Sequence, residues 1–75
     1  MLSCQLSSID DAKKLVNLCM QYGEDIDVIH RRQIIDGKSL LGVISLVGNM
    51  VSVEMLTENK DTEMAFKKHF YETFL

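Results

Sequence analysis

Three features that mark common protein classes are missing from this sequence: an excess of basic residues, a long hydrophobic run and closely spaced cysteines. Its 75 residues contain eight Lys and Arg against eleven Asp and Glu, a formal net charge of −3. Nucleic-acid binding needs cations that neutralise phosphates, so this balance argues against a nucleic-acid partner. Cys4 and Cys19 form no CxxC pair and have no neighbouring histidine, so we expect buried, reduced thiols and no metal site.

No segment has the length and composition of a membrane span or a secretory signal. The most apolar region, residues 40–56, is interrupted by two glycines, an asparagine and a glutamate, whereas a span needs about 20 mostly apolar residues. The first eleven residues contain no basic residue and reach Asp10 too soon for a signal's apolar core. We therefore expect a cytoplasmic protein that does not attach to membranes.

The chain has no proline, no tryptophan, no linker and no repeat, which indicates one domain over residues 1–75. Apolar and polar residues alternate as in strands at 2–6, 25–30, 33–35 and 51–55. Helical spacing follows Ser8, Ser39 and Asn59, and Gly23 is expected to end the first helix. The residues expected to face the core are Leu2, Cys4, Leu6, Ala12, Leu15, Val16, Cys19, Met20, Ile26, Val28, Val51, Val53, Met55, Ala65, Phe66, Phe70 and Phe74, with Met50 and Met64 as further apolar fillers.

The predicted element order is βαββαβα. Strands with one apolar face and helices with one apolar stripe fit a single antiparallel sheet that three helices cover on one side. The sequence therefore predicts an α+β open-faced sandwich, and a ferredoxin-like arrangement is the competing fold.

This order and the segment 38–46, Lys-Ser-Leu-Leu-Gly-Val-Ile-Ser-Leu, resemble HPr, the histidine-containing phosphocarrier of the bacterial sugar phosphotransferase system. The segment is similar to the family's signature around its regulatory serine at almost every position. Ala12, Leu15 and Val16 also fall where the family's first helix has apolar residues. The resemblance covers nearly the whole chain and implies the HPr-like sandwich, with four strands in the order 1-4-2-3.

The resemblance also implies that the family's catalytic residues are replaced. Alignment through the first helix puts Ser8 at the histidine position, Asp10 at the arginine position and Asp11 at a proline position. A neutral imidazole can accept a phosphoryl group and hand it on, whereas phosphoserine is a stable ester. Two neighbouring carboxylates would also repel the phosphate dianion. The resemblance therefore implies a domain with no catalytic residue and no enzymatic activity.

Ser39 matches the regulatory serine, which a dedicated ATP-dependent kinase phosphorylates in HPr of Gram-positive bacteria so that it binds a transcription factor as corepressor. Two interpretations of Ser39 stay open. Serine is among the best helix N-caps, and a phosphate at that position would also meet free backbone amides. In the family, the following helix forms part of the docking surface for partner proteins, and the matching residues are Lys38, Leu40, Leu41, Val43 and Ile44.

Neither histidine is expected to replace the missing acceptor. His30 ends a strand beside Arg31 and Arg32, and His69 lies on the polar side of the last helix, so neither occupies a helix N-terminus. Arg31, Arg32 and Lys38 are expected to form a solvated face, with binding of an acidic partner or a phosphate as the alternative.

The resulting prediction is a non-catalytic HPr-like domain without a cofactor that binds a protein. The partner would be a phosphotransferase-system component, an HPr kinase or a transcription regulator. Two alternatives remain: a functioning phosphocarrier that uses another acceptor, and a small-molecule effector-binding α/β sandwich domain.

Overall fold

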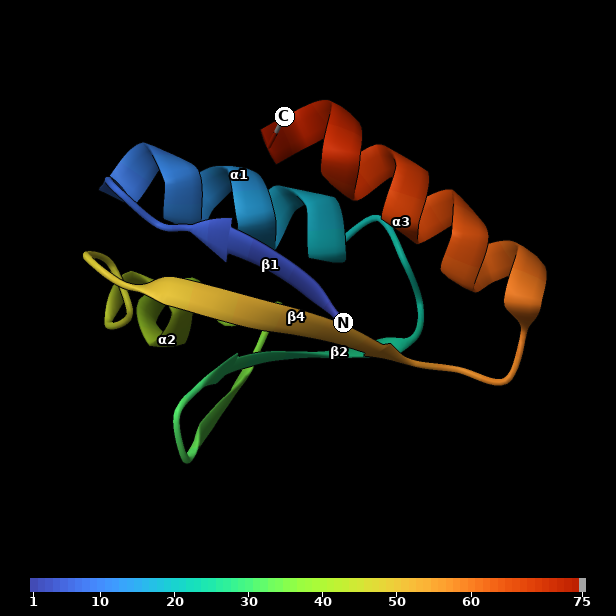
Figure 1. Ribbon diagram of the computed structural model, residues 1–75, viewed down its shortest axis with the longest axis horizontal. Helices are drawn as coiled ribbons and strands as arrows, with labels where there is room; N and C mark the ends of the chain where they lie inside the picture. Colours follow the sequence, from blue (N-terminus) through green and yellow to red (C-terminus); the bar gives the residue numbers. More distant parts are fainter. Residues whose placement is uncertain (75) are drawn as a thin grey trace.

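The predicted element order is confirmed by the computed structural model, which describes residues 1–74 (Figure 1). The alternation of apolar and polar residues builds the strands, and the three- and four-residue spacing builds the helices. The strands are β1 (Leu2–Gln5), β2 (Asp25–His30), β3 (Gln33–Asp36) and β4 (Met50–Leu56), and the helices are α1 (Ile9–Cys19), α2 (Leu40–Ile44) and α3 (Lys60–Phe74).

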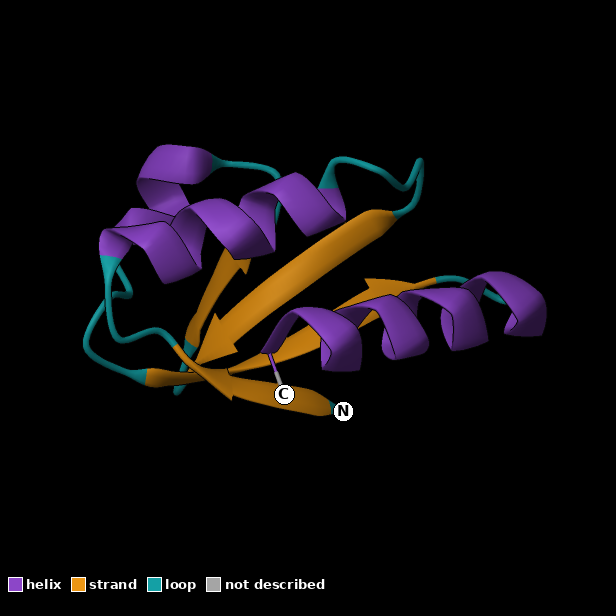
Figure 2. Cartoon of the chain, turned by 90° about the horizontal axis from the view of Figure 1, so that it is seen from above, coloured by secondary structure: helices purple, strands orange, loops and turns teal. Residues whose placement is uncertain are grey.

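The four strands form one antiparallel sheet in the order β1-β4-β2-β3, as the resemblance implied. Helices α1 and α3 lie above this sheet in Figure 1, and Figure 2 looks down on them with the strands beneath. The short helix α2 packs against α1 and against β3. The fold is therefore the α+β open-faced sandwich, and in the described part of the chain no helix covers the second face of the sheet.

A single hydrophobic core fills the space between the helices and the inner face of the sheet. Leu15 of α1, Val28 of β2 and Phe66 of α3 are each almost completely removed from water. The alternation expected for the last strand is confirmed, because Val51, Val53 and Met55 are buried while the residues between them are not.

Three methionines that were predicted to pack in the core are exposed instead. Of the four methionines expected as fillers, only Met55 is buried, whereas Met20, Met50 and Met64 are exposed. Met20 follows the last residue of α1, and Leu18 packs inward instead. Met50 precedes the buried Val51 and so faces the other side of the sheet.

Two expectations about helix geometry also fail. Ala65 is exposed, because it lies one residue, about 100° of helix rotation, before the buried Phe66 and away from Phe70. The first helix ends at Cys19, so Gly23 lies beyond its C-cap and does not terminate it. Neither difference changes the fold, because the remaining apolar positions of each helix still reach the core.

The outer face of the sheet carries a row of like charges. Asp27 of the central strand β2 lies directly opposite Glu54 of β4 on one side and Asp36 of β3 on the other. In the adjacent outward row, Ile29 lies opposite Ile34. Carboxylates directly opposite each other on neighbouring strands destabilise a sheet. The register therefore places two unfavourable pairs around Asp27.

Helix α2 approaches the sheet so closely that one position requires glycine. A Cβ atom built on Gly42 would lie 2.6 Å from Cγ2 of Ile35 in β3 and 3.1 Å from Oγ of Ser39. The first of these contacts is shorter than packed carbon atoms tolerate. Glycine at position 42 therefore allows α2 to pack against β3.

We expect the substitution Asp27→Asn to stabilise the fold, because it removes both unfavourable pairs while keeping the size of the side chain. The free energy of unfolding should rise by about 0.5 kcal/mol at low ionic strength, measured by urea denaturation. The matched control is Asp25→Asn in the same strand, whose cross-strand partner is Leu56. Equal effects of the two substitutions would contradict the prediction.

We expect Gly42→Ala to destabilise the fold by about 1–2 kcal/mol, because the overpacking against Ile35 outweighs alanine's better helix propensity. Gly23→Ala is the control, since a Cβ atom there would have no neighbour within 4 Å. Its stability should equal or slightly exceed that of the wild type. Thermal unfolding of both variants tests the difference, and a Gly42→Ala variant as stable as Gly23→Ala would refute it.

Candidate functional site

Two side-chain hydrogen bonds close the start of α1, where the family's histidine would lie. Oγ of Ser8 accepts a hydrogen bond from the Asp11 amide at 3.2 Å, and Oδ2 of Asp11 accepts one from the Ser7 amide at 2.8 Å. Asp10 and Asp11 both lie in the first turn, where negative charge complements the positive end of the helix dipole. Ser8 and Asp11, which the resemblance to HPr aligns with the family's acceptor and a proline, thus cap the helix.

His69 lies far from this cap, at the other end of α1. Its Nδ1 atom is 3.3 Å from the hydroxyl of Tyr22, which follows the C-terminal end of α1. Since a helix rises 1.5 Å per residue, α1 separates His69 from Ser8 by roughly 16 Å. His69 is half-buried, so the expectation that it lies on the polar side of α3 was wrong, because the loop that carries Tyr22 packs over it.

His30 lies where the sequence predicted, at the hairpin end of β2, and is paired with Gln33 of β3. The hairpin places it beside Arg31, which has a φ of 58° in the turn. Neither histidine therefore lies at a helix N-terminus. Arg31 and Arg32 are exposed in that turn, and Lys38 is half-buried beside α2, so the three cations do not all share one solvated turn.

Ser39 caps α2 in the way that its position predicts. Its Oγ accepts a hydrogen bond from the Gly42 amide at 3.3 Å, and its own amide donates to the Asp36 carbonyl at 3.0 Å. The Lys38 amide donates to Oδ1 of Asp36 at 2.9 Å. Ser39 remains half-buried, so its hydroxyl is used structurally and still lies near the surface.

The residues predicted to contact a partner are divided between surface and core. Leu41 is 83% exposed and Leu40 is 39% exposed, while Ile44 is partly buried against the core. Val43 is completely buried, so its assignment to a docking surface was wrong. The five-residue helix must direct one side chain into the core to stay attached, and Val43 is that residue.

A shallow groove of about 310 Å³ runs between α1 and α2. Val16, Met20 and Leu40 supply its apolar part. The exposed Met20 was missed as a surface residue because its phase suggested the core. We call this feature the α1–α2 groove; its lining residues are Lys13, Val16, Asn17, Met20, Lys38 and Leu40.

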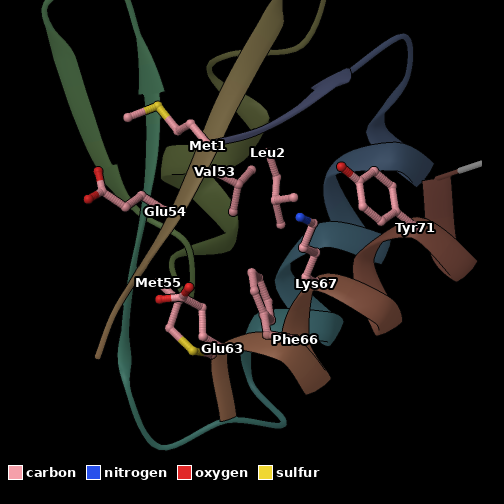
Figure 3. A pocket seen from close by; sticks show the side chains of 9 residues that line it. All are labelled: Met1, Leu2, Val53, Glu54, Met55, Glu63, Phe66, Lys67 and Tyr71. Carbon is pink, nitrogen blue, oxygen red and sulfur yellow. The ribbon is translucent and has the colours of Figure 1, made fainter. Parts of the chain in front are cut away.

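A second hollow, of about 330 Å³, lies between α3 and strands β1 and β4 (Figure 3). Leu2, Val53 and Phe66 form its apolar side, and Glu63 and Lys67 of α3 supply charges of opposite sign. None of the residues predicted for function lies in it. Across residues 1–74, no group of histidine, cysteine or acidic side chains is arranged to hold a metal ion.

Cys4 and Cys19 are free thiols in the core. Burial raises the pKa of Cys4 to about 11, with a smaller contribution from the charge of Asp11. Burial likewise raises the pKa of Cys19 to about 12. Both thiols are therefore protonated near neutral pH, which makes them poor nucleophiles and poor metal ligands.

No helix within the described residues has the length and apolar character needed to cross a membrane.

Comparison with known proteins shows the fold of this chain. No protein-family description matches the sequence, and no curated protein matches it by sequence. Among solved structures, HPr from Bacillus anthracis str. Ames superposes with a TM-score of 0.68 at 20% identity, covering 99% of this chain and 94% of that one. HPr-C-His from Thermoanaerobacter tengcongensis superposes with a TM-score of 0.69 at 16% identity, covering 96% and 90%.

A third structure is the Bacillus subtilis catabolite repression containing protein Crh, which forms an intertwined dimer through a swapping domain. It matches with a TM-score of 0.64 at 19% identity, over 99% of this chain and 88% of that one. The resemblance to HPr is therefore confirmed as a common fold over nearly the full length, at low sequence identity.

We expect both thiols of the native protein to resist an aromatic disulfide reagent at pH 8. With pKa values of about 11 and 12, their thiolate fraction lies on the order of a hundredfold or more below that of an unfolded cysteine with a pKa of about 8.5. The absorbance of the released thiol, followed with and without urea, measures this difference. Rapid labelling of the folded protein would contradict it.

Proposed function

We propose that this chain is a non-catalytic, HPr-like protein-interaction domain of the cytoplasm that binds a partner through α2 and the α1–α2 groove. The observation that carries this proposal is the start of α1, where Ser8 accepts a hydrogen bond from the Asp11 amide and Asp11 accepts one from the Ser7 amide, so both side chains are used in capping the helix. A phosphocarrier needs an imidazole there, because phosphohistidine forms and transfers its phosphoryl group readily. The serine and its two neighbouring aspartates supply neither that acceptor nor a cation that would hold the phosphoryl group.

The surface of α1 and α2 favours a protein as the partner. Met20 and Leu41 expose apolar side chains that the core does not use, and Met20 lines the groove together with Lys13 and Lys38. Apolar anchors flanked by charges are typical of protein interfaces, where charge sets the choice of partner. A partner that presents an apolar side chain and carboxylates fits this surface best.

Phosphorylation of Ser39 would cancel the positive charge of this surface. A phosphoserine carries close to two negative charges at neutral pH, and Ser39 lies next to Lys38, which lines the groove together with Lys13. An acidic partner would then lose its electrostatic attraction to the groove. Ser39 would thus act both as the cap of α2 and as a regulatory residue. The similarity to the catabolite repression containing protein Crh supports a regulatory role.

Intact-mass spectrometry after two separate reactions tests the proposal. With phosphoenolpyruvate and Enzyme I, we expect no phosphoryl group on this chain, whereas HPr from Bacillus anthracis should gain one. With ATP and an HPr kinase, we expect one acid-stable phosphoryl group that the Ser39→Ala variant lacks. We also expect Leu41→Asp to slow this reaction about tenfold, because it places a charge in the docking surface.

Met64→Asp is the matched control for the docking surface, because Met64 is similarly exposed but lies on α3. It should react with the kinase at the wild-type rate. An acid-labile phosphoryl group from phosphoenolpyruvate would overturn the non-catalytic assignment. Failure of the kinase reaction would remove Ser39 from the regulatory proposal and leave it as a helix cap.

A further inference from the structure

We propose that the open face of the sheet is a second docking surface, and that its occupant is a basic amphipathic helix of a partner protein. By the open face we mean the outward side chains of β2, β3 and β4 on the side opposite the helices. Its central part consists of the acidic row Asp36, Asp27 and Glu54 and, beside it, the apolar pair Ile34 and Ile29.

The charged residues that the strands place on this face are all acidic, and the nearest cations along the chain are Arg31 and Arg32 in the turn between β2 and β3. None of the four strands contains a lysine or an arginine, and Asp25 precedes Asp27 in the outward phase of β2. Charged side chains do not cover the whole face, because the apolar Ile34 is 65% exposed next to the half-buried Ile29. The open face thus combines an apolar strip with a negative strip.

Asp36 lies on the edge strand β3 and accepts a hydrogen bond from the Lys38 amide, but neither stability nor protection of the sheet edge explains the other two acids of the row, Asp27 and Glu54. Like charges directly opposite each other weaken the sheet, yet Asp27 has such a neighbour on both sides. Charged residues on edge strands prevent sheets from pairing with each other, but β2 and β4 are the two central strands. A row that costs stability at the centre of a sheet is the kind of local conflict expected at a binding site.

The geometry of the rows favours a helix as the occupant. The acidic row runs across the strands, which lie about 4.8 Å apart. Basic residues one helical turn apart rise about 5.4 Å along a helix axis, so such residues would meet Glu54, Asp27 and Asp36 in succession. The apolar row lies about 7 Å away along the strands, where the helix's neighbouring apolar stripe would cover Ile34 and Ile29.

Charge also excludes the other occupants. A second copy of the chain would bring the same acidic face, in a protein whose net charge is −3, and nucleic-acid phosphates would be repelled. The lysines of the α1–α2 groove lie on the helix side of the molecule, so the two surfaces select partners of opposite charge. This inference does not depend on the proposed function, and either one can fail alone.

A titration of the isotope-labelled chain with a designed peptide tests the inference. The peptide forms a helix of about fourteen residues, or four turns, with lysine and leucine each repeated once per turn on adjacent stripes. We expect saturable binding that shifts the amide resonances of β2, β3 and β4 and leaves those of α2 unchanged. The double variant Asp27→Asn with Glu54→Gln should bind about tenfold more weakly and with a smaller dependence on salt.

The charge-matched control is Asp10→Asn with Glu72→Gln, which removes two carboxylates from α1 and α3 and should bind like the wild type. A peptide with glutamate in place of lysine should not bind. The inference is overturned by equal affinity for both double variants, by no binding to the folded protein, or by shifts confined to the α1–α2 groove. Self-association or oligonucleotide binding through the open face would likewise overturn it.

Discussion

The structure depends on the burial of one apolar face of a four-stranded sheet beneath α1 and α3. A chain of 75 residues can build only one such core. All three helices and the inward-facing residues of all four strands contribute to it. Because the core takes the apolar residues of one side, the other side of the sheet is left to water or to a partner. The helix ends also lie outside the core, so each of α1 and α2 receives its own serine cap.

The sequence predicts those parts of the molecule that depend on local periodicity. The alternation in β4 and the caps at Ser8 and Ser39 are local patterns, and the structure contains them. The sequence-based predictions fail where the burial of a residue depends on the exact end of a helix, or on a contact with a residue far along the chain. Met20 is exposed because α1 ends one residue before it, and the contact of His69 with Tyr22 joins residues 47 positions apart.

The residues of the candidate surfaces also divide into those that a local sequence pattern reveals and those that only the fold brings together. Ser39 and Leu41 could be singled out from the sequence because they lie in a segment similar to the HPr signature. The acidic row could not, because Asp36, Asp27 and Glu54 become neighbours only through the register of three strands. The start of α1 lies between these cases: the resemblance to HPr predicts that its residues replace the family's acceptor site, but only the structure shows the hydrogen bonds by which Ser8 and Asp11 cap the helix.

The close approach at Gly42 joins helix α2 to an edge strand whose two sides belong to different surfaces. A Cβ atom at position 42 would lie 2.6 Å from Cγ2 of Ile35, so the backbone of α2 packs directly on that strand. The preceding residue of the strand, Ile34, points to the opposite side of the sheet. One edge strand thus contributes one residue to the attachment of α2 and the next to the open face.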